Sequence, residues 1–226
     1  MNKVSFVSLF ANPLMQVQLD LDLGKLTEFA FQLKNKDVKG TQASNNGGWQ
    51  SYNIREEKHE EFEKLKKEIN QYLQKYHSEI FRGMKFKEKN VIQNFGNMWI
   101  NINEQYHFNE WHIHGGSTLS GVYYIKHDGS VENGNIMFKH PNYLYLLEGH
   151  WPPEVIEETN EITTEIISIV PNANMLLIFP SWLEHQVEAN LKTDSRISFS
   201  FNSFANTFSP NDIYRKYYFK NSNDKP

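Results

Sequence analysis

The sequence predicts an α+β domain in which a few helices support a double-stranded β-helix, the jelly roll made of two packed sheets. Apolar residues recur at helical spacing in parts of residues 20–80, whereas short β-like runs follow one another from about residue 90. Gly, Asn and Pro separate these runs, and aromatic residues make up 14% of the chain, which favours a β-rich interior. Since 226 residues suit one domain, we expect helical support at about 20–80 and a jelly-roll core at about 90–205.

The first part of the chain predicts one strand, two helices and a loop between the helices. Residues 4–17 have the pattern of a strand region, and residues 26–33 that of a short amphipathic helix. Residues 41–51 contain Asn-Asn-Gly-Gly and are expected to form a loop. The second helix, from about residue 56 to residue 76, is the most regular, because Glu and Lys occupy the faces that its apolar side chains leave. These apolar side chains are Phe62, Leu65, Ile69, Tyr72, Leu73 and Tyr76.

The second part of the chain predicts a series of short strands. They are expected at residues 91–103, 118–125, 135–139, 165–170, 175–179 and 196–204. Residues 141–164, which contain Trp-Pro-Pro, are expected to form a long excursion between two strands. The tail is expected to form a short helix capped by Ser209 or Asn211, and its aromatic residues 214–219 could pack on the core or on a second copy in a homodimer.

The composition excludes several classes of protein. Lys and Arg number 23 against 27 Asp and Glu, so the net charge of −4 gives no general reason to expect nucleic-acid binding. The chain has no Cys, which excludes disulfides, thiolate metal ligands and cysteine nucleophiles. No apolar stretch approaches the roughly 18 residues of a membrane-spanning helix, and the N-terminus lacks a convincing signal peptide. We therefore expect a cytoplasmic protein without a membrane partner.

Three histidines and one arginine carry the chemistry. His112 and His114 end a strand-like stretch before a Gly-Gly turn, His185 lies far along the chain, and Arg196 follows it eleven residues later. Two imidazoles one residue apart on an extended segment point to the same side and can converge on one ion. A third from a distant strand would close a facial arrangement that leaves open positions on iron, zinc, copper or nickel. Arg196 would offer a fork of donors to a carboxylate.

Several stretches resemble one family. They are residues 44–51, 99–103, 112–114 with 119–124, 176–185 and 196–202, and they spread over most of the chain. In order and spacing they resemble the iron(II)/2-oxoglutarate-dependent oxygenases of marine bacteria and their phages, relatives of the prolyl hydroxylases. The resemblance implies a cupin-like double-stranded β-helix with Fe(II) at one mouth, and 2-oxoglutarate and dioxygen as cosubstrates.

The resemblance also implies a set of metal ligands, with one departure. His112 matches the first ligand of the family and His185 the distal one. His114 stands where the broader superfamily has Asp or Glu, so the site would hold three neutral imidazoles. Alternatively, Glu110, which lies two residues before His112 on the same side of an extended chain, supplies the missing carboxylate.

The cosubstrate residues follow from the same resemblance. Arg196 matches the residue that grips the far carboxylate of 2-oxoglutarate, and Ser198 matches its hydroxyl helper. Tyr124 resembles the tyrosine that often joins this grip, although it equally fits plain strand packing. Asn101 is a weaker candidate on the preceding strand.

Other interpretations stay open at several of these positions. Arg196 could form an ordinary surface ion pair with Asp194 or Glu188. The loop at residues 44–51 is either a tight turn or a lid that places Trp49 and Gln50 over the mouth. The remaining histidines lie on a helix or in loops and are expected to be solvated. They are His59, His77, His107, His127, His140 and His150.

The leading functional prediction is a 2-oxoglutarate-dependent dioxygenase that hydroxylates an unidentified substrate. The kinship with prolyl hydroxylases favours a peptide residue such as proline. The runner-up is a cupin-like metal-binding protein without 2-oxoglutarate chemistry. A third class is a β-sandwich interaction module whose histidines bind nothing.

Overall fold

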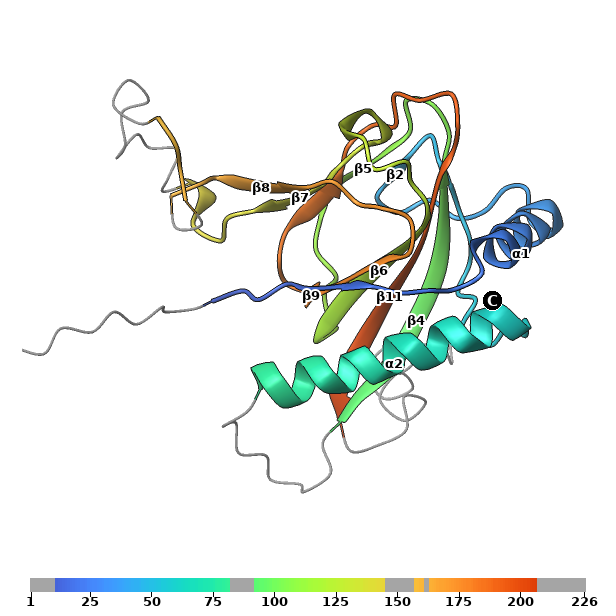
Figure 1. The fold of residues 1–226 in the computed structure, drawn as a ribbon, viewed down its shortest axis with the longest axis horizontal. Coiled ribbons are helices and arrows are strands. Elements are labelled where there is room, and N and C mark those ends of the chain that lie inside the picture. Colours follow the sequence, from blue (N-terminus) through green and yellow to red (C-terminus); the bar gives the residue numbers. More distant parts are fainter. Residues whose placement is uncertain (1–10, 82–91, 145–156, 161–162, 207–226) are drawn as a thin grey trace, which may run out of the picture.

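The computed structural model describes residues 11–81, 92–144, 157–160 and 163–206, which form two facing antiparallel sheets and two helices (Figure 1). The larger sheet has the order β1 (Met15–Gln18), β9 (Met175–Pro180), β6 (Leu119–Lys126), β11 (Arg196–Asn206), β4 (Ile92–Asn103), β3 (Trp49–Gln50). The smaller sheet has the order β2 (Asn45–Asn46), β5 (Phe108–His112), β10 (His185–Val187), β7 (Ile136–Lys139), β8 (Ile166–Ile169). A short 3-10 helix, η1 (Val131–Asn133), precedes β7.

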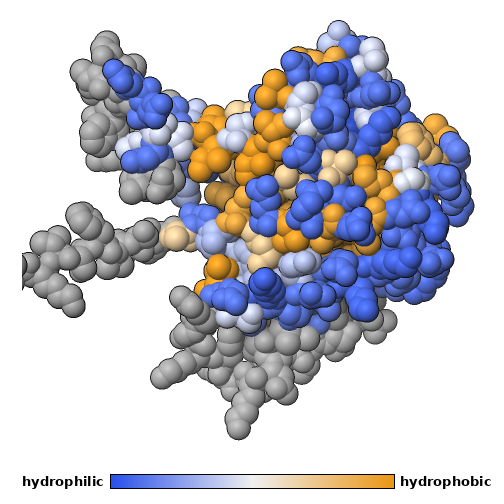
Figure 2. Space-filling view, in the orientation of Figure 1, coloured by the Kyte–Doolittle hydropathy of each residue, from blue (hydrophilic) through white to orange (hydrophobic). Residues whose placement is uncertain are grey.

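The two helices cover the outer face of the larger sheet (Figure 1). Helix α1 (Leu23–Lys36) begins after Asp22, whose side chain accepts a hydrogen bond from the Lys25 amide. Helix α2 (Glu60–Ile80) buries its apolar stripe against the sheet, with Phe62 5.8 Å from Phe199 between ring centroids. The outward side of α2 is mostly hydrophilic in the space-filling view (Figure 2). Both predicted helices are thus present, and the Glu- and Lys-rich face of the second is solvated as expected.

Strand alternation gives the larger sheet two different faces. Alternate residues of β4 and β11 pack under the helices in the main core: Met98, Ile100, Ile102, Ile197, Phe199 and Phe201. The residues between them face the smaller sheet and line a pocket: Trp99, Asn101, Asn103, Arg196, Ser198 and Ser200. Burying an apolar side chain stabilises a fold by about 1.5–3 kcal/mol, so the apolar face fixes the register of both strands. That register places the polar residues between the sheets.

The six predicted strands of the second half are present, with bounds within a few residues of expectation. The first strand is shorter than predicted, because within the described residues it covers only Met15–Gln18. Strand β5 is the strand-like stretch expected before the Gly-Gly turn and ends at His112, whereas β10, with three residues, was not among the predicted runs. The predicted tail helix and the Trp-Pro-Pro segment, with His150, lie outside the described residues.

The predicted loop at residues 41–51 is more ordered than expected. It contains β2, which pairs with β5 of the smaller sheet, and β3, which pairs with β4 of the larger sheet. Trp49 is 7% exposed in the main core, and its Nε1 donates to the Asp37 carbonyl at 2.7 Å. Trp49 is therefore a core residue on the helix-covered face of the larger sheet, and of the two interpretations of this loop the one that places Trp49 over the mouth is wrong. Neither helix in the described ranges has the length and apolarity needed to cross a bilayer.

Candidate metal centre

Three histidines meet between the two sheets. His112 ends β5, His114 lies in the turn that follows, and His185 begins β10. Strands β5 and β10 pair so that His112 and His185 are direct partners. One nitrogen of each of the three rings lies within 4.8 Å of the others, a spacing at which the three histidines could hold a metal ion.

Two of the three rings have a defined tautomer. The Nδ1 of His112 is 2.6 Å from the Glu110 carbonyl, and the Nδ1 of His185 is 2.8 Å from the Leu183 carbonyl. Because a carbonyl only accepts, both Nδ1 atoms must carry the proton, so in each ring Nε2 carries the lone pair. This is the arrangement that orients histidine ligands in metal sites.

Burial keeps the cluster neutral. It lowers the pKa of His185 to about 3 and that of His114 to about 4, with the neighbouring histidines adding to both shifts. Burial also lowers the pKa of His112, and the hydrogen bond to Glu110 opposes this shift. Neutral imidazoles are the form that coordinates metals, so the cluster is prepared for an ion at neutral pH.

The walls around the cluster are aromatic. Phe179 and Phe138 lie 4.8 Å and 6.0 Å from His185 between ring centroids, and Trp99 lies 5.5 Å from His114. Glu110, the alternative carboxylate ligand, is exposed, and its Oε1 accepts from Asn46 at 3.4 Å. Its carboxylate is not part of the cluster.

Arg196 lines the same pocket as the three histidines, at the position on β11 that pairs with Asn103. It is 1% exposed, and its Nη1 donates to the carbonyls of Asn133 at 2.7 Å, Glu188 at 2.9 Å and Gly134 at 3.4 Å. A Cβ on Gly134 would lie 2.1 Å from Nη1, so only glycine leaves room for this contact. The other nitrogen, Nη2, is buried without a partner in the described part of the chain. The surface ion pair considered for Arg196 is wrong, because the guanidinium is buried and bonded to backbone carbonyls.

The remaining predicted cosubstrate residues lie in one row across three neighbouring strands. Ser198 on β11 is paired with Tyr124 on β6 and with Asn101 on β4. The Tyr124 hydroxyl and the Asn101 Oδ1 are buried and, like Arg196 Nη2, have no partner among the described residues. Burial raises the pKa of Tyr124, and the positive charge of Arg196 opposes the shift, so the hydroxyl stays protonated. Asn101 and Arg196 line the pocket, and their unpaired polar atoms fit a polar ligand that supplies the missing partners.

Sequence reasoning missed part of the pocket wall. Ser44, Asn103 and Asn109 line it, and the Ser44 hydroxyl is 3.5 Å from Nε2 of His112. Ser44 lies inside the stretch that carried the resemblance, so a role for that stretch could have been inferred, but the pairing of β2 with β5 that places it could not.

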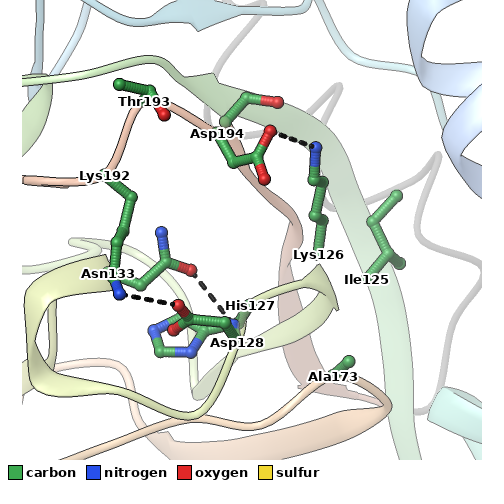
Figure 3. Close-up of a pocket in the computed structure, with 10 residues that line it drawn as sticks. Ile125, Lys126, His127, Asp128, Asn133, Ala173, Lys192, Thr193 and Asp194 are labelled. Carbon is green, nitrogen blue, oxygen red and sulfur yellow. Dashed lines mark hydrogen bonds and ion pairs between the residues drawn. The ribbon is translucent and has the colours of Figure 1, made fainter.

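His127 corrects the expectation that the other histidines are solvated. It is 6% exposed, with Nε2 3.2 Å from the Gly134 carbonyl and Nδ1 accepting from the Gly129 amide at 3.1 Å. On its outer side lies an open surface hollow (Figure 3). The charged groups there are paired, Lys126 with Asp194 at 3.7 Å and Lys192 with Asp128 at 3.3 Å. The hollow therefore lacks the unpaired groups that mark the pocket between the sheets.

Fold and site define a β-rich protein with a three-histidine cluster and a buried arginine in one pocket. Residues 97–202, which include the cluster and Arg196, match the profile of a family described as “Putative 2OG-Fe(II) oxygenase”. No curated protein matches the chain. Fe(II) and 2-oxoglutarate, the cofactors predicted from the sequence, are those of the matched family, and the three histidines could hold the metal.

Solved structures show the same fold at low identity. A prolyl-4-hydroxylase from Pseudomonas putida matches with a TM-score of 0.55 and 12% identity, over 85% of this chain and 93% of the other. The alpha-ketoglutarate-dependent carbocyclase SnoK from nogalamycin biosynthesis matches with a TM-score of 0.59 and 13% identity, over 88% of this chain and 83% of the other. HygX from Streptomyces hygroscopicus, with nickel and 2-oxoglutarate bound, matches with a TM-score of 0.56 and 11% identity, over 88% of this chain and 85% of the other.

Proposed function

We propose that this protein is an Fe(II)- and 2-oxoglutarate-dependent dioxygenase that hydroxylates a substrate at the three-histidine cluster. One observation carries the proposal: a single pocket is lined by the metal-binding cluster and by a buried Arg196 with an unused donor. A five-carbon acid with a 2-oxo acid group at one end and a carboxylate at the other suits such a pocket.

The residues of the chain would bind and orient the reactants. His112, His114 and His185 would hold Fe(II) through neutral imidazoles. Arg196 would hold the far carboxylate of 2-oxoglutarate, with help from Ser198, Tyr124 and Asn101. Burial lowers the pKa of Arg196 to about 10, which still leaves the guanidinium charged at neutral pH. When bound, iron and 2-oxoglutarate supply the activation of dioxygen for hydroxylation, with succinate as coproduct.

Charge balance supports this assignment. Three neutral imidazoles add no charge, so the +2 charge of iron would be cancelled by the 2-oxoglutarate dianion. The net charge of iron and its ligands would then be about zero. A carboxylate in place of His114 would leave about −1 near the iron. The neutral sum suits a pocket whose wall around the cluster is aromatic.

We propose a peptide residue such as proline as the substrate. The fold shared with a Pseudomonas putida prolyl-4-hydroxylase supports this choice. SnoK, described as a carbocyclase, has the same fold, so the fold is compatible with other chemistry. The test is to incubate the iron-loaded protein with proline-containing peptides and to look for a gain of one oxygen atom by mass spectrometry.

The cosubstrate assignment is tested by titrating the anaerobic Fe(II)-loaded protein with 2-oxoglutarate. We expect a visible charge-transfer band in the wild type and none in His185→Ala, because His185 is a proposed iron ligand. With dioxygen admitted, the wild type should form succinate. Iron bound without a band would favour the alternative, a cupin-like metal-binding protein without 2-oxoglutarate chemistry.

A further inference from the structure

A second unused donor lies beside Arg196. Asn103, the last residue of β4, is 2% exposed and lines the pocket between the sheets. Its side-chain Nδ2 is buried without a partner in the described ranges. Its backbone is used, since the carbonyl accepts from Asn190 Nδ2 at 3.1 Å. The main chain of Asn103 is thus fixed while its amide group is left unpaired.

The register of the sheet places this donor next to Arg196. Asn103 and Arg196 are direct partners across β4 and β11, and directly opposed residues point to the same face. The neighbouring row, nearer the metal cluster, is that of Asn101 and Ser198. Asn101 donates its Nδ2 to Ser200 at 3.2 Å, which leaves its Oδ1, an acceptor, unpaired. The unpaired donors nearest to each other in register are therefore those of Asn103 and Arg196.

Gly48 makes the space that Asn103 occupies. A Cβ at position 48 would lie 2.8 Å from Asn103 Nδ2 and 3.3 Å from its Cγ. Trp49 pairs with Ile102, which places Gly48 beside Asn103 at the end of β4. A side chain at position 48 would push the amide away from where it lies.

Arg196 needs a companion to hold a carboxylate. Its Nη1 is already bonded to backbone carbonyls, so it presents Nη2 alone and cannot form the usual two-pronged contact through both terminal nitrogens. A buried N–H without a partner costs about 1–3 kcal/mol, and a carboxylate, which only accepts, could satisfy two such donors at once.

We propose that Asn103 Nδ2 and Arg196 Nη2 together bind the far carboxylate of 2-oxoglutarate, and that Asn103 thereby selects 2-oxo acids with a second carboxylate. The inference rests on the proposed function. Asn103 is a cosubstrate-binding residue: it adds no charge, and it supplies the second donor that Arg196 lacks. The Tyr124 hydroxyl on β6 is a third unpaired group within electrostatic range of Arg196.

The test compares two ligands that differ only at the far end. The anaerobic Fe(II)-loaded protein is titrated with 2-oxoglutarate and with 2-oxopentanoate, which has the same length and a methyl group in place of the far carboxylate. The readout is the visible charge-transfer band. We expect Asn103→Leu to weaken 2-oxoglutarate binding by on the order of 10- to 100-fold, the value of a hydrogen bond to a charged group, and to leave 2-oxopentanoate binding unchanged. Asn103→Asp, which keeps the shape and adds a negative charge, should weaken 2-oxoglutarate binding further.

A control and a second route keep the outcome clear. Asn97 lies on the same strand, where its side-chain oxygen accepts a hydrogen bond from Asn202 at 2.9 Å, and it does not line the pocket. The control substitution Asn97→Leu should therefore leave the affinities for both ligands unchanged. Gly48→Ala should weaken 2-oxoglutarate binding by displacing the Asn103 amide. Equal losses for both ligands in the Asn103 variants, or no loss for 2-oxoglutarate, would overturn the proposal while the wild-type band still stands. If the wild type itself shows no band with 2-oxoglutarate, the proposed function fails first.

Discussion

His112 and His185 are direct partners across β5 and β10, and the two rings are held in the same way. Their centroids lie 4.3 Å apart, and each Nδ1 donates to the carbonyl of the residue two positions earlier. His114 differs, because it lies in the turn after β5 and its ring has no hydrogen bond in the described part of the protein. The cluster thus combines two candidate ligands whose rings are fixed with a third that has more freedom.

This asymmetry predicts unequal effects of removing the ligands. His185→Ala should lower the affinity for Co²⁺ or Zn²⁺ by at least about 100-fold, since it removes a fixed ligand together with its outer-shell bond. His114→Ala should cost less, because the fixed pair remains. Competition with a chromophoric chelator measures both affinities, with His140→Ala, outside the cluster, as the control. A larger loss in His114→Ala than in His185→Ala would contradict this order.

The charge of the third ligand predicts the redox behaviour of bound iron. His114→Asp adds one negative charge beside the metal, which favours Fe(III) over Fe(II). We expect iron bound to this variant to oxidise faster in air than iron bound to the wild type, in the absence of 2-oxoglutarate. The Fe(II) that remains is measured over time with a colorimetric chelator. The same rate in both proteins, with iron retained, would mean that the ligand charge does not control oxidation.

Arg196 has a structural role that its expected binding role did not reveal. Its Nη1 bonds to carbonyls before β7 and after β10, so it bridges these two neighbouring strands of the smaller sheet at the end where Ile136 pairs with Val187. Arg196→Met should lower the free energy of unfolding by about 2–4 kcal/mol even without ligand, because buried carbonyls lose a charged donor. Ser198 lies on the same face of β11, and its hydroxyl has no hydrogen bond within the described residues. Ser198→Ala should therefore change the free energy of unfolding by less than about 0.5 kcal/mol. Urea unfolding compares the two, and equal stability of Arg196→Met and the wild type would refute this role.

The sequence could predict those features that depend on local pattern. The helical spacing of α2, the alternation along β4 and β11 and the His-x-His step are all contained in short segments. In contrast, the residues that neighbour a side chain on adjacent strands cannot be identified from a short segment. Asn103 and Ser44 reach the pocket through pairings between segments far apart in the chain, with no composition signal. His127 was expected in solvent because it follows a strand end, and no pattern in the next few residues indicates that the Gly129 amide and the Gly134 carbonyl fold back onto its ring.

Trp49 shows the same limit and yields a stability prediction. A Gly-rich loop with an aromatic residue has the pattern of a lid, yet the two-residue strand β3 places this side chain in the main core. Trp49→Ala should lower the free energy of unfolding by about 3–5 kcal/mol, the cost of emptying a large core site. Trp49→Phe, which loses only the bond to the Asp37 carbonyl and part of the ring, should cost less. A Trp49→Ala protein as stable as the wild type but unable to bind substrate would instead support the lid.

His127 predicts how stability depends on pH. Burial lowers its pKa below the usual 6.5, the positive charge of Arg196 adds to this, and the Gly134 carbonyl and Asp128 oppose it. Tyr124, whose ring lies 5.7 Å away, stays neutral. As pH falls below about 6.5 the unfolded chain takes up a proton that the folded chain resists, so stability decreases down to the folded pKa and is unaffected above 6.5.

Protonating Nδ1 would also break its bond from the Gly129 amide. His127→Gln can keep both hydrogen bonds and does not titrate, so its free energy of unfolding should fall less between pH 7 and pH 5 than that of the wild type. Urea unfolding with a chelator present isolates this difference, since the other buried histidines are common to both proteins. Parallel pH profiles would mean that His127 is as easily protonated in the folded protein as in the unfolded chain.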